Sequence, residues 1–275
     1  MSAALAPAPS ADQAVAEAFV TARLAARALP DYPGEIPLEM SRSYAIQDAA
    51  IALYPDRVVG WKVGGVPPAQ QPALGVHRLA GAIFAGNVWR TGAAPTPLPA
   101  IEGGFAAVEA EFIARIGADT DPAKTDWTLE EAADQIDAVF IGVELAGSAL
   151  STINDLGSAV VASDFGNNGG LVIGPELTDW RERLDAVKVE TIIDGESVGV
   201  GGSPSLAGGA LESVRFLLEH CARWGRPLTA GTLISTGAVT GVHRIYAGSE
   251  STCVFEGVGE VRCSVVKAAP HPTQD

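Results

Sequence analysis

The stretch Val58-Val59-Gly60-Trp61-Lys62-Val63-Gly64-Gly65 marks the point at which the character of the chain changes. Before it, apolar residues recur at helical spacing. After it, short apolar runs alternate with glycines and turn residues almost to the C-terminus, as in a series of strands. We therefore expect a helical cap over residues 1–57, a mainly β region over residues 58–267 and a short tail over residues 268–275.

Two helices are expected in the cap, one over residues 11–29 and one over residues 43–53 with Ser41 or Ser43 as its N-cap. In the β region, Asp194-Gly195 is a hairpin signal between two strands. The spacing of apolar residues predicts two further helices, over residues 129–136 and 210–224. The predicted strands cover residues 58–63, 107–116, 138–145, 169–173, 186–193, 197–200, 233–236, 252–255 and 260–266.

Composition limits the partners of the protein. The 275-residue chain has a formal net charge of −15, which repels nucleic acid and anionic membranes, so we expect neither as a partner. An anionic substrate would need local positive charge from a Lys, an Arg or a metal ion. Three cysteines without a CxxC pair, no signal-peptide pattern and no long apolar span predict a cytoplasmic protein.

Three glutamates stand in patterns that suggest a metal site. Glu109 and Glu111 alternate with apolar residues and so share one face of a predicted strand. This pair alone is also explained by a solvent-facing surface. Glu144, however, ends an almost continuous apolar run, where a buried carboxylate must be paired or bound to a cation. An all-oxygen site suits Mg²⁺ or Mn²⁺ better than Zn²⁺, and the four histidines show no zinc-binding spacing.

Two further segments are candidates for substrate contacts. Lys62 lies among glycines, where it is either an exposed lysine at a strand end or a group that neutralises a substrate carboxylate or transfers a proton if its pKa is lowered. The glycine-rich segment from Ser163 to Gly174 has backbone amides that can donate to the oxygens of a bound acid. A structural loop built on Asx turns explains this segment equally well.

Taken in order, these segments resemble the 2-keto-4-pentenoate hydratase and 4-oxalocrotonate decarboxylase branch of the fumarylacetoacetate hydrolase superfamily. Further support comes from Gly81-Ala82-Ile83-Phe84 and from Thr236-Gly237-Ala238-Val239-Thr240-Gly241. The resemblance covers most of the chain. It implies an α+β fold, with an N-terminal helical region followed by a mixed β-roll, and assembly into a homo-oligomer.

The resemblance also implies the makeup of the active site. Mg²⁺ or Mn²⁺ is expected on Glu109, Glu111 and Glu144. Residues expected around a small 2-oxo acid substrate are Lys62, His77 and Asp164 as catalytic groups, and Leu79, Asn168, Thr236 and His243 as binding groups.

The chain departs from the family pattern at Leu79-Ala80-Gly81, where hydratases commonly carry an acid before the glycine. His77 or His243 is then the candidate to replace that acid. A second departure is Phe165, which replaces a polar residue and suggests a drier pocket.

The resemblance implies a lyase that hydrates a 2-hydroxy-2,4-dienoate to a 4-hydroxy-2-oxo acid through a metal-bound enolate. The same enolate also forms when a 2-oxo diacid loses CO₂. The alternatives are therefore a decarboxylase of the 4-oxalocrotonate type, a C–C hydrolase of acylpyruvates, and a non-catalytic member that binds a 2-oxo acid.

Overall fold

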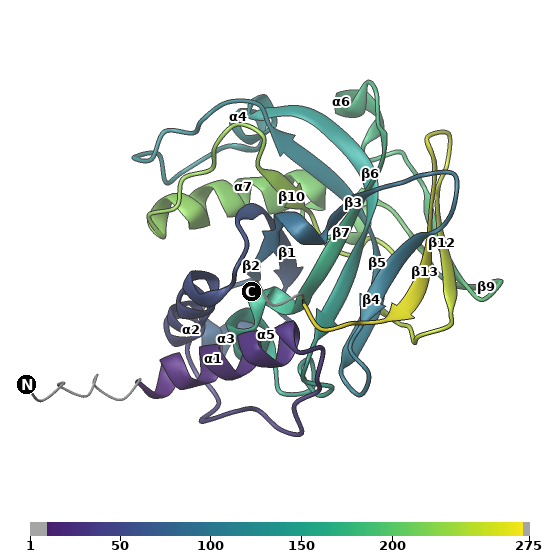
Figure 1. Ribbon diagram of the computed structural model, residues 1–275. Helices are drawn as coiled ribbons and strands as arrows, with labels where there is room; N and C mark the ends of the chain where they lie inside the picture. The colour runs from purple at the N-terminus through teal and green to yellow at the C-terminus, as the bar shows by residue number, and fades with distance from the viewer. Residues whose placement is uncertain (1–9, 272–275) are drawn as a thin grey trace, which may run out of the picture.

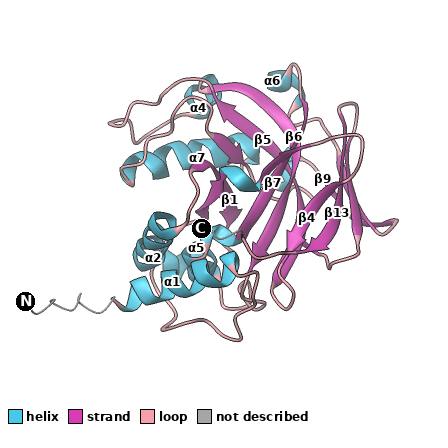
Figure 2. Cartoon of the chain, viewed as in Figure 1, coloured by secondary structure: helices cyan, strands magenta, loops and turns pink. Residues whose placement is uncertain are grey.

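The computed structural model describes residues 10–271 and places a group of helices beside two curled sheets (Figure 1, Figure 2). The helices are α1 (Ala11–Leu24), α2 (Met40–Leu53), α3 (Gln71–Leu74), α4 (Leu129–Asp134), α5 (Ser158–Ser163), α6 (Trp180–Arg183) and α7 (Gly209–Arg223). In Figure 1, α1, α2, α3 and α5 gather at one side of the molecule, away from the sheet formed by the C-terminal strands. This arrangement confirms the predicted α+β class. None of the helices in the described residues is both long and apolar enough to cross a membrane.

Eight strands form the larger sheet, in the order β2-β1-β10-β5-β6-β7-β3 with β11 paired to β5, and five form the smaller, in the order β4-β13-β12-β8-β9. Both sheets are mixed, because β1 with β10, β3 with β7 and β4 with β13 are parallel pairs among antiparallel ones. The strands are β1 (Val58–Gly65), β2 (Arg78–Phe84), β3 (Val88–Arg90), β4 (Thr96–Ala100), β5 (Phe105–Ile116), β6 (Ile136–Ser148), β7 (Asn168–Glu176), β8 (Val189–Ile193), β9 (Glu196–Gly201), β10 (Leu233–Ser235), β11 (His243–Arg244), β12 (Glu250–Phe255) and β13 (Gly259–Lys267).

The two central strands, β5 and β6, are buried on both faces along almost their whole length. The smaller sheet covers one of these faces, where Phe112 of β5 meets Phe255 of β12 with ring centroids 5.5 Å apart. Because side chains alternate along a strand, Glu109 and Glu111 lie on the opposite face of β5 from Phe112. The smaller sheet therefore seals one side of the larger sheet and leaves the glutamates on the other.

Several predicted boundaries are wrong. Helix α1 stops at Leu24, well before residue 29, and Ala26 just beyond it has a left-handed φ of 49°. Helix α2 begins at Met40 with Glu39 as its N-cap, and the hydroxyl of Ser43 donates to the carbonyl of Glu39 instead of capping the helix. The prediction of Ser41 or Ser43 as the cap is therefore incorrect.

Other elements gave too weak a pattern to be predicted. Strands β3 and β11 span only 3 and 2 residues, and β4 contains two prolines, which its position at the edge of the smaller sheet tolerates. The short α3, α5 and α6 were likewise missed. In the predicted tail, the amide of Ala268 donates to the carbonyl of Ala100 at 2.8 Å, while residues 272–275 lie outside the described part of the chain.

Arg23, in the last turn of α1, ties the helical region to the larger sheet. Its Nε donates to Oδ1 of Asp164 at 2.6 Å, and its Nη1 and Nη2 donate to the carbonyls of Asn168 at 3.0 Å and Gly147 at 2.8 Å. The other carboxylate oxygen of Asp164 accepts from the hydroxyl of Ser148 at 2.6 Å. Asp164 is fully buried, so this ion pair satisfies a charge that has no access to solvent.

Replacing Arg23 tests this link. In Arg23→Met the Asp164 carboxylate stays buried without its cation, so the free energy of unfolding is expected to fall by about 3–5 kcal/mol. The double variant Arg23→Met/Asp164→Asn removes both charges and is expected to lose less. Urea denaturation measures both values. The exposed Arg27→Met is the control and is expected to change stability by less than about 0.5 kcal/mol. Equal losses in the single and double variants would contradict this account.

Candidate metal and substrate site

Three glutamates meet on the inner face of the larger sheet. Glu109 of β5 lies directly across from Glu144 of β6 in the antiparallel register, and Glu111 is two residues further along β5. One carboxylate oxygen from each lies within 4.8 Å of the others. The three residues are at most 5% exposed, so the interpretation of Glu109 and Glu111 as a solvent-facing surface is wrong.

The hydrogen bonds of the triad leave oxygens free. Oε2 of Glu111 accepts from the hydroxyl of Ser235 at 2.6 Å and from the amide of Gly237 at 2.8 Å. Oε1 of Glu144 accepts from Nδ2 of Asn168 at 2.9 Å. The other oxygens, Oε1 of Glu111 and Oε2 of Glu144, are buried and accept no hydrogen bond in the described residues, although the ammonium of Lys62 lies 3.3 Å from the latter. Since buried polar atoms are rarely left unpaired, this donor set fits a hard divalent cation.

Lys62 supplies a positive charge beside the triad. Its ammonium lies 3.3 Å from Oε2 of Glu144, and its side chain is only 7% exposed. Burial lowers the pKa of Lys62, but the neighbouring carboxylates of Glu144, Glu109 and Glu111 raise it by more, so the pKa is raised overall. The lowered pKa on which a neutral lysine base would depend is therefore not found, and Lys62 is an ammonium in the metal-free protein.

Glu109 of the triad lines a cavity of about 890 Å³ between the edge of the larger sheet, α7 and the segment before β7. Four of the predicted residues besides Glu109 line this cavity, namely Lys62, His77, Leu79 and Thr236. His77 is exposed, and its Nδ1 is 2.7 Å from Oε1 of Gln71. Leu79 is only 2% exposed and presents an apolar wall. The cavity is thus polar at the triad and apolar beside Leu79.

Two of the predicted residues are not where the sequence suggested. His243 lies opposite Val108 of β5, and directly opposed residues share a face of the sheet, so it points away from Glu109. It lines a separate hollow with Val198, and its Nε2 is 3.0 Å from the carbonyl of Thr240. The prediction of His243 in the substrate site is therefore wrong.

Asp164 is also placed differently from the prediction. Both of its carboxylate oxygens are engaged, by Arg23 and Ser148, and it does not line the cavity. These contacts indicate a structural role for Asp164 next to β7. They do not favour the prediction that Asp164 is a catalytic group. Asn168 touches the triad directly, because it donates to Glu144.

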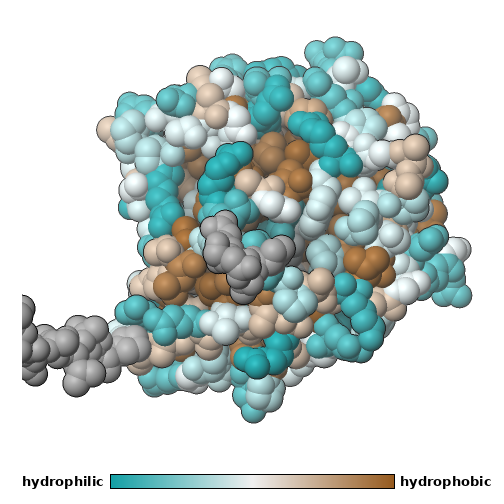
Figure 3. Space-filling model, in the orientation of Figure 1, coloured by the Kyte–Doolittle hydropathy of each residue, from teal (hydrophilic) through white to brown (hydrophobic). Residues whose placement is uncertain are grey.

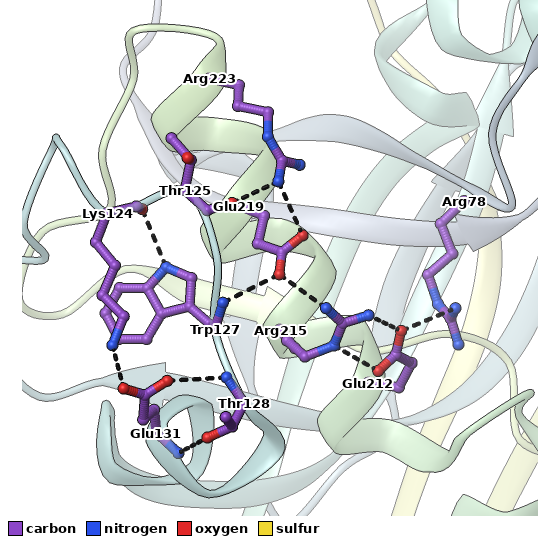
Figure 4. Close-up of polar contacts among 10 residues, drawn as sticks. All are labelled: Arg78, Lys124, Thr125, Trp127, Thr128, Glu131, Glu212, Arg215, Glu219 and Arg223. Carbon is purple, nitrogen blue, oxygen red and sulfur yellow. Dashed lines mark hydrogen bonds and ion pairs between the residues drawn. The ribbon is translucent and has the colours of Figure 1, made fainter.

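A network of charged residues on the cavity wall was not predicted from the sequence (Figure 4). Arg215 of α7 donates to both carboxylate oxygens of Glu212, at 2.8 and 2.6 Å, and to Glu219 at 2.7 Å. Arg78 of β2 lies 3.9 Å from the same Glu212. The spacing of three and four residues along α7 was the signal available for this network. Its charges cancel in pairs, so Lys62 is left as the cation next to the triad.

Figure 3 shows how hydrophilic and apolar residues are distributed on one face of the molecule. Hydrophilic residues dominate its outline, and apolar residues gather toward its centre, where the surface is hollowed. On this face, polar residues meet the solvent while apolar residues line the recess.

Comparison with known proteins gives a family match and several relatives. Residues 69–266 match the family model described as fumarylacetoacetate (FAA) hydrolase C-terminal. The chain is 32% identical over 210 residues to a 2-keto-4-pentenoate hydratase of Paraburkholderia xenovorans (strain LB400), which covers 75% of each chain. It is 29% identical over 229 residues to a 2-keto-4-pentenoate hydratase of Paraburkholderia phymatum, covering 81% of this chain and 84% of the relative.

Solved structures share the fold at lower identity. A 4-oxalocrotonate decarboxylase from Pseudomonas putida G7, complexed with magnesium and adipate, has a TM-score of 0.77 at 20% identity and covers 95% of this chain and 99% of its own. A fumarylpyruvate hydrolase from Pseudomonas aeruginosa, in complex with Mn²⁺ and pyruvate, has a TM-score of 0.56 at 19% identity and covers 78% of this chain and 91% of its own.

The triad makes stability depend on pH in a defined direction. Burial raises the pKa of Glu109 to about 7 and also raises that of Glu111, whereas the unfolded value is 4.5. The stability that these protonated groups contribute is therefore complete below about pH 4.5 and is lost as pH rises through about 7. In EDTA, the melting temperature is expected to fall between about pH 5.5 and pH 8.

A cation needs the carboxylates deprotonated, so the rise in melting temperature on adding Mn²⁺ should be larger at about pH 8 than at about pH 5.5. Glu111→Gln should abolish most of that rise, while the control Glu219→Gln, on the cavity wall outside the triad, should retain it. A Mn²⁺ effect of equal size at both pH values would contradict this reading.

Proposed function

The chain belongs to the fumarylacetoacetate hydrolase family, and on that premise we propose that it is a divalent-metal-dependent lyase acting on a small 2-oxo acid. Its proposed reaction is hydration of a 2-hydroxy-2,4-dienoate, a compound like 2-keto-4-pentenoate, to a 4-hydroxy-2-oxo acid. The buried triad of Glu109, Glu111 and Glu144 next to Lys62 is the observation that carries the proposal. Further support comes from the two relatives named as 2-keto-4-pentenoate hydratases.

The triad is proposed to hold Mg²⁺ or Mn²⁺, the ions bound in the decarboxylase and the fumarylpyruvate hydrolase. Its oxygen donors and its two oxygens without a hydrogen-bond partner suit either ion. Such a cation supplies a Lewis acid that stabilises negative charge on the oxygens of a 2-oxo acid. The hydrogen bonds from Ser235, Gly237 and Asn168 hold the carboxylates in place for it.

Lys62 is proposed to act in its ammonium form. It neutralises part of the charge of an anionic substrate in a protein whose net charge is −15, and it delivers a proton to C3 of the substrate. The raised pKa of Lys62 supports a charged ammonium in the metal-free protein. His77 lines the outer part of the cavity and is held by Gln71, which is compatible with a supporting contact to the substrate.

A decarboxylase of a 2-oxo diacid is the second candidate, and Leu79 is the observation that favours it. Loss of CO₂ needs stabilisation of the resulting negative charge and a later proton donor, but no group that directs a water molecule. An apolar wall at Leu79 is compatible with that chemistry. We place hydration first because the relatives with the higher identity are hydratases.

We further propose a domain division, a compartment and an oligomeric state for this protein. Residues 58–267 are proposed to form the catalytic β-roll and residues 1–57 a helical cap that Arg23 fastens to it. The three cysteines are free and buried, which supports a reducing compartment such as the cytoplasm. Homo-oligomer formation is proposed from family membership.

A substrate screen tests the proposed reaction. Protein supplied with Mg²⁺ or Mn²⁺ is expected to convert a 2-hydroxy-2,4-dienoate to a 4-hydroxy-2-oxo acid, followed by loss of the dienoate absorbance and by NMR of the product. EDTA is expected to abolish turnover and added metal to restore it. Release of CO₂ from a 2-oxo-3-enedioate, with no hydration of any dienoate, would replace hydratase by decarboxylase.

The role of Lys62 is tested by Lys62→Ala. Loss of a positioned acid is expected to lower kcat by about 10²-fold or more. The exposed Lys188→Ala, outside the cavity, is the control and is expected to retain activity. A Lys62→Ala variant with unchanged kcat/KM would remove Lys62 from the mechanism.

A further inference from the structure

The segment between α5 and β7 has an unusual backbone. Phe165, Gly166 and Asn167 are three successive residues in the left-handed region, with φ of 51°, 64° and 63°. Residues other than glycine occupy this region at a cost, and such strain persists only where the surroundings impose it. The surroundings here are tight, because the carbonyl of Phe165 occupies the place where any side chain on Gly81 would begin.

This turn lies next to both Lys62 and the triad. A Cβ on the preceding Gly166 would lie 3.0 Å from Cδ of Lys62, so the turn packs against the lysine side chain. The following residue, Asn168, donates to Glu144 at 2.9 Å. Asn167 therefore stands in the chain between a residue that contacts the proposed acid and a residue that contacts the proposed metal site.

The side chain of Asn167 has an acceptor with no partner. Asn167 lines the cavity and is only 3% exposed, and its Oδ1 makes no hydrogen bond in the described residues. Its Nδ2 donates to Oδ1 of Asn154 at 3.4 Å, which leaves Oδ1 as the free atom of the amide. A buried acceptor at this position calls for a donor that is supplied from the cavity.

The chemistry of the reaction identifies that donor. The carboxylate and keto oxygens of a 2-oxo-3-enoate can only accept hydrogen bonds, so the substrate in the form that adds water has no donor to offer. The water molecule has two. Leu79, which lines the same cavity, cannot hold water because its side chain is apolar.

We propose that Oδ1 of Asn167 accepts a hydrogen bond from the water that adds to C4 of the substrate and thereby orients its oxygen toward that carbon. This inference rests on the proposed hydratase function and assigns to Asn167 the orienting task for which Leu79 is unsuited. After the reaction, the same acceptor binds the new hydroxyl on C4.

The addition of water to the C3=C4 bond needs no further reactant. The water oxygen forms a bond to C4, the electron pair of the C3=C4 bond shifts toward the oxygen on C2, and C3 then takes a proton from the ammonium of Lys62. The proton that the attacking water loses restores that ammonium. Asn167 accepts a hydrogen bond throughout and takes no proton, so one molecule of water is added in total.

Two variants separate the amide from the backbone turn. Glycine adopts the left-handed conformation freely, so Asn167→Gly deletes the acceptor without adding strain. Asn167→Asp is the matched control, because aspartate also tolerates this conformation and keeps an acceptor oxygen. Two rates are measured for each protein with Mg²⁺: hydration of a 2-hydroxy-2,4-dienoate, and exchange of the C3 protons of 2-oxopentanoate for deuterium by NMR. Exchange requires removal and return of a proton at C3 next to the metal, but it requires no attacking water.

In Asn167→Gly, the ratio of hydration to exchange is expected to fall by about 10- to 100-fold through kcat, while Asn167→Asp keeps a ratio nearer that of the wild type. An unchanged ratio in Asn167→Gly, whether both rates fall in parallel or neither falls, would overturn the assignment of the water to Asn167. The proposed function fails in a different way: the wild-type protein would exchange C3 protons but hydrate no dienoate, and the role of Asn167 would fall with it.

Discussion

The mutual repulsion of three buried carboxylates is the constraint on which the rest of the site depends. Glu109 and Glu144 face each other across adjacent strands, and Glu111 lies beside them. Like charges opposed in this way destabilise a sheet unless something compensates them. Lys62 compensates one charge at 3.3 Å, and a divalent cation would compensate the others and contact the unpartnered Oε1 of Glu111. A bound cation would offset the cost of the cluster.

The fold meets this constraint by burying the two central strands almost completely and by hydrogen bonds that hold the glutamates in place. The smaller sheet closes the other face of β5 and β6, so that water does not reach the strands from that side. Arg23 reaches from α1 to Asp164 and to the carbonyls of Gly147 and Asn168, and Asn168 in turn donates to Glu144. A helix far away in the sequence thus fixes the geometry of a ligand on β6.

The rest of the cavity wall combines charged residues with apolar ones. On one side, Arg215 and Arg78 are neutralised by Glu212 and Glu219, so they add hydrogen-bonding capacity but little net charge. Near the triad, Leu79 contributes an apolar surface. A water molecule in this part of the cavity has few places to bind, and the groups that do hold it decide whether a reactive 2-oxo acid is hydrated.

The sequence by itself determined the helical start, the α+β class, the three glutamates and Lys62. It did so because alternation along a strand places Glu109 and Glu111 on one face, and because a carboxylate at the end of an apolar run cannot stay unpaired. Only the tertiary structure decided the rest. The pairing of β11 with β5 turned His243 away from the site, and the reach of Arg23 drew Asp164 into an ion pair. The left-handed turn at Asn167 depends on the close approach of Gly81. These outcomes follow from strand register and from contacts between residues far apart in the chain, because local sequence patterns predict neither of them.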